Sequence, residues 1–209
     1  MGKLTLYFHR GISKITSKFY PNITGSSFVD HRAVVYNNNN LIMEERTNID
    51  GHAIIMNTRA KFIMKKYSGA AVDLTVICGG HMSVPGFHHK QITDEYKDTH
   101  DINGDYDKDV VVEEDVWIAS KVTLLSGVHI GRCSIIGSGA VVRGNIPPYS
   151  IVVGNPAKVI GFRFTPQEAL KHEEALFPEG ERMTLEELQN NYQRYFVKKI
   201  RTIKEFVSL

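Results

Sequence analysis

The 209-residue chain has little of what marks extracellular, membrane-spanning or nucleic-acid-binding proteins. Its only cysteines, Cys78 and Cys133, cannot build a disulfide framework, so reduced thiols are expected. The net charge of +2 shows no excess of one sign that would indicate nucleic acid or a membrane surface as partner. No hydrophobic run has the length of a membrane span, and the apolar stretch within MGKLTLYFHRG is too short for a signal peptide. We therefore predict a cytoplasmic protein without a membrane span.

What the chain does contain is a period of six residues between Val112 and Pro147: VEEDVW, IASKVT, LLSGVH, IGRCSI, IGSGAV and VRGNIP. Every hexad opens on Val, Ile or Leu, residue types that together make up about a fifth of ordinary sequence, so chance is a poor explanation. The opening positions are Val112, Ile118, Leu124, Ile130, Ile136 and Val142. A period of six fits neither an α-helix nor a plain strand, but it fits a β-helix in which each hexad is one short strand and a corner.

This repeat predicts an all-β solenoid, a parallel β-helix, over residues 29–163. Fainter hexads begin at Val29, and the pattern slips by two residues after Leu41. The run from Asn37 to Asn40 is either a widened corner or a surface loop, because Asn tolerates left-handed backbone. Residues 1–28 carry no clear repeat and form either an opening strand or a short cap.

Residues 82–111 interrupt the repeat with a thirty-residue excursion loop. Loops of this length inside a compact solenoid tend to be functional. Acids alternate from Asp101 to Asp109, as in a calcium loop, but Tyr106 and Val112 stand where an EF-hand needs Gly and Glu. A solvated loop is the better interpretation.

Residues 164–209 are predicted to form helices that cap the open end of the solenoid. Thr165-Pro166-Gln167-Glu168 is a helix start, and that helix should end near Ala175, before Pro178. A second helix should begin at Thr184 and end in the basic stretch KKIRTIKEF. Covering exposed strand edges explains these helices better than membrane binding does.

The hexads, the segment SGAAVDLTVICGGH ending at His81, the stretch EEDVWIAS and the tail GNPAKVIGFRF resemble the hexapeptide-repeat acyltransferases. The nearest branch is that of the xenobiotic and sugar O-acetyltransferases, including maltose-type and capsular-polysaccharide enzymes, and the match covers about residues 29–164. The resemblance implies a left-handed helix, a homotrimer with active sites between subunits, and acetyl-CoA as co-substrate. It implies no metal, and as acceptor a saccharide or another small-molecule hydroxyl compound.

His81 is the predicted general base. Acyl transfer from a thioester needs an acceptor hydroxyl that loses its proton, and an imidazole titrates near neutral pH. His81 follows Gly79 and Gly80, which allow an unusual turn, and the resemblance places the catalytic histidine here. His88 and His89 are weaker candidates. Cys78, three residues earlier, could act as a nucleophile, but its place in a strand suggests a buried structural thiol.

The resemblance also implies residues for the two substrates. Small side chains and the tail motif would line the pantetheine, and Lys158 and Arg163 would meet the CoA phosphates. The predicted coenzyme contacts are Trp117, Ala119, Gly137, Ser138, Pro156, Ala157, Lys158 and Arg163. Ala119 stands where the family usually has Gly. The acceptor contacts, by looser analogy, are Tyr36, Asn57 and His88.

Three alternatives stay open at this point. One is a metal-dependent enzyme similar to the gamma carbonic anhydrases, for which His81 and His129 could offer ligands, although a third histidine at suitable spacing is missing. Another is an N-acetyltransferase for an amino sugar. The third is a non-catalytic trimeric scaffold. The identity of the acceptor and the acyl chain length cannot be read from the sequence.

Overall fold

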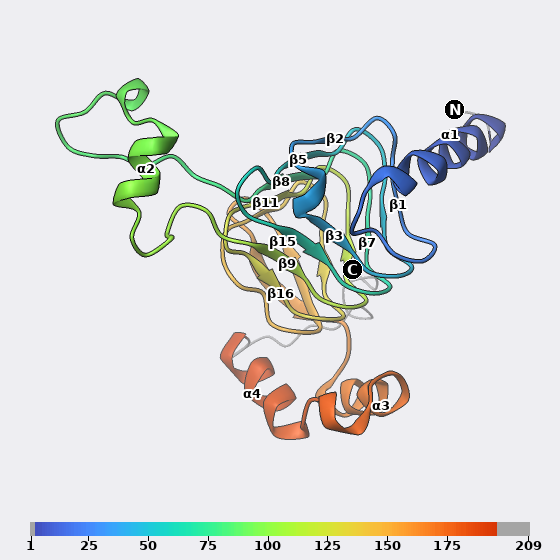
Figure 1. The fold of residues 1–209 in the computed structure, drawn as a ribbon. Helices are drawn as coiled ribbons and strands as arrows, with labels where there is room; N and C mark the ends of the chain where they lie inside the picture. Colours follow the sequence, from blue (N-terminus) through green and yellow to red (C-terminus); the bar gives the residue numbers. More distant parts are fainter. Residues whose placement is uncertain (1–2, 196–209) are drawn as a thin grey trace.

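The computed structural model describes residues 3–195, which wind into a parallel β-helix with three flat sheets (Figure 1). Sheet I holds β1 (Phe28–Val29), β4 (Asn48–Ile49), β7 (Gly69–Ala70), β10 (Trp117–Ile118), β13 (Ile135–Ile136), β15 (Ser150–Val153) and β16 (Lys158–Phe162). Sheet II holds β2 (Val34–Val35), β5 (Ile54–Met56), β8 (Thr75–Ile77), β11 (Thr123–Leu124) and β14 (Val141–Val142). Sheet III holds β3 (Leu41–Met43), β6 (Phe62–Met64), β9 (Val110–Val112) and β12 (His129–Ile130). Each coil runs through sheets I, II and III in turn, so the solenoid has a I–II, a II–III and a III–I edge.

The hexad pattern corresponds to the core. All six opening residues are fully buried, and Ile118 pairs in register with Ala70 below it and Ile136 above it. The same holds on sheet II, where Leu124 lies between Val76 and Val142. Identical positions of successive coils therefore stack into one inward column of aliphatic side chains, as the sequence predicted.

Left-handed corners keep the coils in phase at the III–I edge. Tyr67, Asp115, Cys133 and Tyr149 occupy equivalent corner positions with φ between 53° and 64°. Each donates its backbone N–H to the carbonyl of the coil below, as Asp115 does to Lys66 O at 3.0 Å and Tyr149 to Arg132 O at 2.8 Å. These hydrogen bonds offset the cost of left-handed backbone in residues with a Cβ.

The structure favours one of the two alternatives for the start of the chain and corrects one prediction about its end. Within residues 1–28, helix α1 (Lys3–Thr16) and a 3₁₀ turn η1 (Ser17–Phe19) lie against the first coil as a cap, although nothing in the sequence indicated that the cap is helical. The tail after Pro148, expected as a further turn of the solenoid, is instead a hairpin: β15 pairs parallel to β13, but β16 returns antiparallel to β15. The polar run Asn38–Asn40 is a 3₁₀ turn, η2, at a corner, which favours the widened-corner interpretation.

The C-terminal cap begins where the sequence predicted it. Helix α3 (Pro166–Leu176) has Thr165 and Glu168 as a capping box; η4 (Glu179–Glu181) and α4 (Leu185–Tyr195) follow. The fully buried carboxylate of Glu173 accepts from Tyr149 Oη at 2.6 Å and from the Met183 N–H at 2.9 Å, tying α3 to the last coil. The predicted basic end, KKIRTIKEF, lies outside the described residues. None of the described helices combines the length and hydropathy that crossing a bilayer requires.

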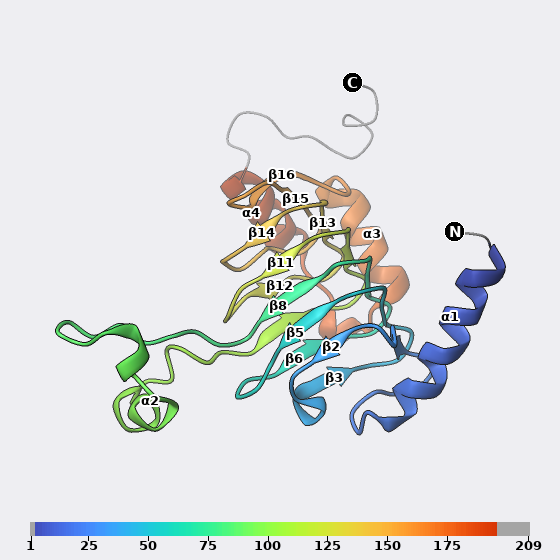
Figure 2. The ribbon, with the colours of Figure 1, turned by 90° about the horizontal axis from the view of Figure 1, so that it is seen from above.

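The excursion loop leaves the solenoid at the II–III edge and contains η3 (His89–Gln91) and α2 (Asp94–His100), which stand away from the coils (Figures 1 and 2). Its two ends meet in an antiparallel bridge between Gly79 and Asp107. The buried Lys97 of α2 places its Nζ 2.7 Å from Asp107 and donates to Gly80 O at 3.2 Å. Arg59 Nε lies 3.1 Å from the same carboxylate. We call these contacts the neck of the loop.

Replacing Asp107 by Asn should loosen the loop without unfolding the solenoid. The substitution leaves the buried cation of Lys97 without its carboxylate, so opening of the loop should become at least about tenfold more frequent. Limited proteolysis within residues 82–106 measures this. The matched control is Asp105→Asn, which breaks an exposed pair with Lys108 and should change cleavage little. Equal cleavage of the two variants would contradict a stabilising neck.

Candidate active site

His81 lies on the first exposed stretch of the loop, directly after the neck. Gly79 is needed there because a Cβ on it would lie 2.6 Å from Asp107 Oδ1. The backbone ahead of His81 is thus fixed by Lys97 and Asp107, while the imidazole itself reaches solvent. Its ring makes an edge contact with His89, the centroids 4.7 Å apart at 76°. A solvent-accessible imidazole on a fixed backbone is what a general base requires.

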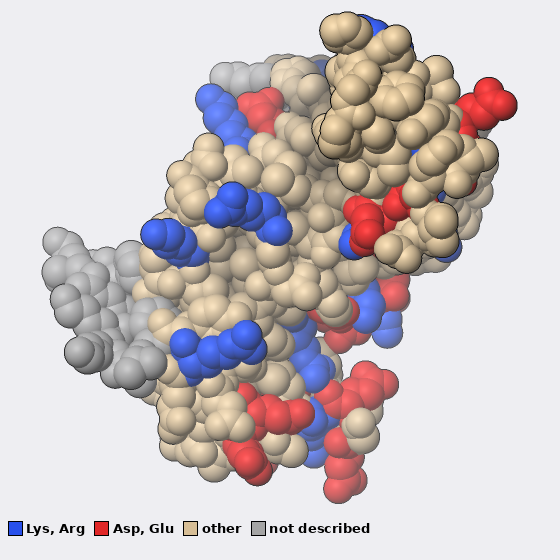
Figure 3. Space-filling model, turned by 90° about the vertical axis from the view of Figure 1, so that its left-hand side faces the viewer, with Lys and Arg blue, Asp and Glu red and all other residues tan. Residues whose placement is uncertain are grey.

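A pocket of about 460 Å³ opens within the loop and is lined by His89 together with Met82, Val84, Phe87 and Ile92. The sequence indicated His89 only as a weaker alternative to His81, and it did not single out the apolar lining. The lining residues are visible in the sequence as apolar residues scattered among polar ones. Many loops without a function have the same composition, so this pattern alone does not predict a pocket. Figure 3 looks at the side from which the loop projects, with several Lys and Arg side chains over the solenoid beside it.

Most of the predicted coenzyme residues share one edge of the solenoid. Ala119 and Gly137 belong to two successive corners at the I–II edge, and Pro156 lies in the β15–β16 turn that is hydrogen-bonded to β14 above them. These segments are joined by backbone hydrogen bonds from Gly139 N to Ser120 O at 3.0 Å and from Ala157 N to Val141 O at 2.9 Å. The structure therefore brings together residues that are up to 38 positions apart in the sequence.

At the last coil of this edge, Gly137 packs closely against Val153, and Lys158 lies nearby. A Cβ on Gly137 would lie 2.7 Å from Val153 Cγ1, so only glycine fits. Ser138 and Pro156 are exposed, and Ala157 is half-buried. Lys158 is exposed and pairs with Val153 across the β15–β16 hairpin. An exposed surface of small residues next to a lysine suits a ligand with an extended chain and a phosphate at its end.

Trp117 and His81 do not meet within one chain. Trp117 lies on β10 of sheet I, next to the I–II edge, and its side chain is 57% exposed. His81 belongs to the II–III edge. Sheet II therefore separates the two residues within one chain.

Two predicted site residues are engaged elsewhere. Asn57 is fully buried; its Oδ1 accepts from Asn37 N at 3.0 Å and its Nδ2 donates to Asn37 O at 2.8 Å. It joins two coils and cannot face an acceptor. Arg163 lies at the III–I edge, away from Lys158, where Nη1 reaches Asp115 Oδ2 at 2.8 Å and Cys133 O at 3.0 Å. The structure thus gives no support to the phosphate role predicted for Arg163.

The two remaining acceptor candidates are exposed. Tyr36 follows β2 at the II–III edge, on the same edge as His81 but two coils below it, and is 60% exposed. His88 precedes η3, and its N–H donates to Gln91 Oε1 at 2.7 Å. Both stay predictions.

Cys78 is structural, as predicted. The thiol is fully buried, its Sγ donates to Lys61 O at 3.4 Å, and burial raises its pKa to about 12. A thiol with this pKa is almost wholly protonated at neutral pH and is therefore a poor nucleophile.

The histidines that a metal-dependent enzyme would use are not gathered in the chain. His129 lies on β12, where Nε2 is 2.7 Å from Glu113 Oε1. Over residues 3–195, no three His, Cys, Asp or Glu side chains are grouped as metal ligands.

Comparison with known proteins identifies relatives of the hexad region. Residues 109–144 match the model of the bacterial transferase hexapeptide (six repeats). A chloramphenicol acetyltransferase from Escherichia coli is 47% identical over 60 residues, 29% of each chain. A probable macrolide acetyltransferase from Lysinibacillus sphaericus is 40% identical over 99 residues, 41% of this chain and 55% of that protein. The chain thus spans between about three tenths and half of the length of these relatives.

A solved structure extends the likeness of fold beyond the hexads. The hexapeptide-repeat containing acetyltransferase VCA0836 from Vibrio cholerae superposes with a TM-score of 0.58 at 18% identity, covering 76% of this chain and 86% of that one. The predicted resemblance and fold are confirmed: the chain carries the bacterial transferase hexapeptide repeat on a left-handed parallel β-helix, as hexapeptide-repeat acetyltransferases do.

Proposed function

We propose that the protein is an acetyl-CoA-dependent O-acetyltransferase that acts on a sugar, a polysaccharide precursor or a similar hydroxyl compound. The observation that carries the proposal is the placement of His81: an exposed imidazole on backbone held by the neck, beside a loop pocket. The acetyltransferase names of the relatives support the reaction type. A cytoplasmic location, which the sequence predicts, would give access to acetyl-CoA.

In this proposal acyl transfer is direct. His81 takes the proton from the acceptor hydroxyl while that oxygen attacks the thioester carbonyl. The tetrahedral intermediate collapses with loss of the CoA thiolate, and the imidazolium returns the proton to the sulfur. No acyl-enzyme is needed, which agrees with the buried thiol of Cys78.

The proposal places the active site between subunits of a homotrimer. His81 and the I–II edge lie on opposite sides of sheet II, so one chain supplies the base and its neighbour the coenzyme wall. Exposed apolar side chains on sheet II, Val34 at 54% and Ile54 at 42%, suit a surface that another chain covers.

His81→Ala should fold and bind acetyl-CoA but lose about 10²–10⁴-fold in kcat, because a positioned base contributes about that much. Calorimetry first establishes acetyl-CoA binding, and thiol release over nucleotide sugars, free sugars and amphenicol-like alcohols identifies the acceptor. His89→Ala serves as the matched control and should lose far less. Near-normal turnover of His81→Ala with that acceptor would remove His81 from the mechanism.

Lys158→Gln should raise the KM for acetyl-CoA about tenfold while kcat changes less than about twofold, since a phosphate contact acts equally on ground and transition states. The control is Lys171→Gln, an exposed lysine on α3. A fall in kcat at unchanged KM would argue against a phosphate contact.

Mixing two inactive variants tests the shared site. His81→Ala and Ser138→Trp, which fills the coenzyme groove, are refolded together. Random mixed trimers should regain about a quarter of the wild-type activity if each site uses both chains. No recovery, with both variants trimeric, would show that the site lies within one chain.

A further inference from the structure

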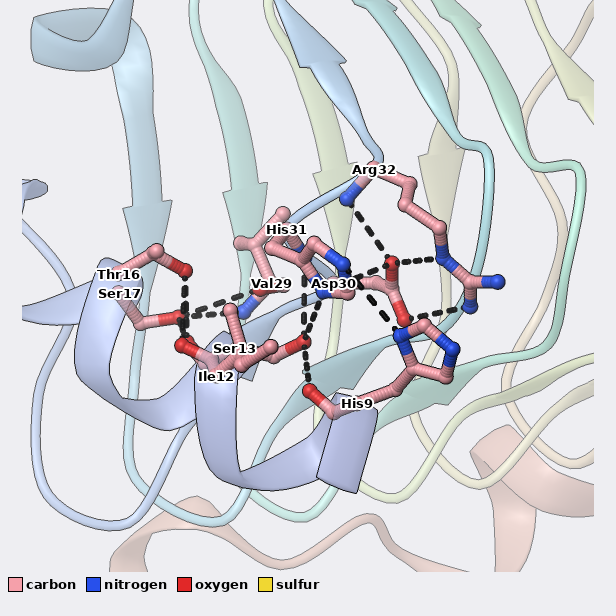
Figure 4. Close-up of polar contacts among 9 residues, drawn as sticks. All are labelled: His9, Ile12, Ser13, Thr16, Ser17, Val29, Asp30, His31 and Arg32. Carbon is pink, nitrogen blue, oxygen red and sulfur yellow. Dashed lines mark hydrogen bonds and ion pairs between the residues drawn. The ribbon is translucent and has the colours of Figure 1, made fainter. Parts of the chain in front are cut away.

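Helix α1 packs on the solenoid through its polar face. Ser17 Oγ accepts the Val29 N–H at 2.8 Å, and Ser13 Oγ accepts the His31 N–H at 3.1 Å (Figure 4). Both serines are buried. The first coil has no coil beneath it to receive these N–H groups, so the serine hydroxyls replace the missing strand. Hydrogen bonds from the serines and the stacking of His9 on His31, with ring centroids 5.1 Å apart, therefore hold this segment against the first coil.

As a consequence, α1 turns apolar side chains to the outside. On α1, Tyr7 is 69%, Phe8 66% and Ile15 63% exposed, and Phe19 on the adjoining turn η1 is 80% exposed. Phe8 and Ile15 are seven residues apart, two helical turns, so they lie on one face of α1. Helices on soluble proteins normally bury such a stripe, and this one is left uncovered because the serine face is used for docking.

Cations occupy another face of α1 than the apolar stripe. Arg10 and Lys14 lie one turn apart, more than about 90° round the helix from Phe8 and Ile15. Both are exposed, as is Lys18 on the adjoining turn η1. Residues 1–29 hold four of the chain's 25 Lys and Arg and none of its 23 Asp and Glu, so the remaining residues carry a net charge of −2. Although the overall charge is small, α1 and the turn η1 that follows it are therefore strongly positive.

We propose that α1 binds the surface of an anionic lipid membrane. Such a surface offers an apolar layer for Phe8 and Ile15 and negative headgroups for Arg10 and Lys14 at the same time. The 14 residues of α1 span about 21 Å, too short to cross a bilayer, so the helix lies in the plane of the interface.

Charge favours lipid over a second copy of the chain as the occupant. A second copy of α1 would offer these cations only further cations, because residues 1–29 contain no Asp or Glu. On the solenoid, Asp30 is already paired with Arg32, with Nε to Oδ1 at 2.8 Å (Figure 4), and Asp50 of the second coil interacts electrostatically with Arg10. The serine contacts fix α1 against the solenoid, so the membrane would hold the whole molecule in one orientation.

Co-flotation of the full-length protein with vesicles tests the proposal. The protein should float with equimolar phosphatidylcholine and phosphatidylglycerol, bind phosphatidylcholine alone at least about tenfold more weakly, and dissociate as salt is raised. Phe8→Ser/Ile15→Ser and Arg10→Gln/Lys14→Gln should each weaken binding at least about tenfold. The matched controls are Ile102→Ser, at a side chain 91% exposed in the excursion loop, and Lys90→Gln.

Circular dichroism and melting temperature confirm that each variant is folded. Absence of flotation with anionic vesicles would overturn the proposal, and so would unchanged binding of folded Phe8→Ser/Ile15→Ser. Sedimentation velocity addresses the second-copy alternative: if this variant changes the oligomeric state of the protein without lipid, the stripe is a subunit contact and the proposal fails. Neither outcome bears on acetyl-CoA binding, which is measured separately.

Discussion

The stacking of each coil on the next is the interaction on which the structure depends. Aliphatic side chains at the same hexad place form a single inward column, and backbone hydrogen bonds tie the coils together along all three sheets. Because each coil touches only its neighbours, stability is a sum of coil-to-coil contacts. Such an arrangement leaves two open ends. Serine hydroxyls accept hydrogen bonds under the first coil, whereas a second hydrophobic cluster and the buried Glu173 carboxylate hold the C-terminal helices against the last coil.

Stacking also brings residues that are far apart in the sequence next to each other along one edge of the solenoid. Ala119 and Gly137 meet because they occupy equivalent corners, and the same logic separates Trp117 from His81 although both flank the loop in sequence. The three edges thereby take on different tasks. The I–II edge carries most of the predicted coenzyme residues, the II–III edge carries the excursion loop, and the III–I edge carries the ion pair of Arg163 with Asp115.

The fold was largely predictable because a six-residue period has one structural solution. The starts of α3 and α4 were predictable from their capping residues, which act locally. The sequence did not predict α1. Apolar residues at helical spacing normally mark the face that packs on the core, but here Phe8 and Ile15 face outward and Ser13 contacts the solenoid. The antiparallel return of β16 was missed as well, because Val and Ile are equally suited to either strand direction.

Candidate site residues could be recognised from short motifs, but the contacts they make with distant parts of the chain could not. His81 and the GNPAK tail were recognisable as short patterns. Asn57 looked polar and available, but its burial depends on Asn37, twenty residues earlier. Arg163 likewise meets Asp115, 48 positions away. Such pairings are set by how coils stack on one another, and no window of sequence contains them.

The neck of the excursion loop has a consequence for how this scaffold can vary. Gly79 lies just after β8 and Asp107 just before β9, and the two residues pair with each other. The pairing brings the two ends of the loop together at the II–III edge. The neck is made by Gly79, Lys97 and Asp107. As long as these residues and His81 are kept, the other residues of the loop can differ in number and kind, and with them the lining of the loop pocket, without changing the coils.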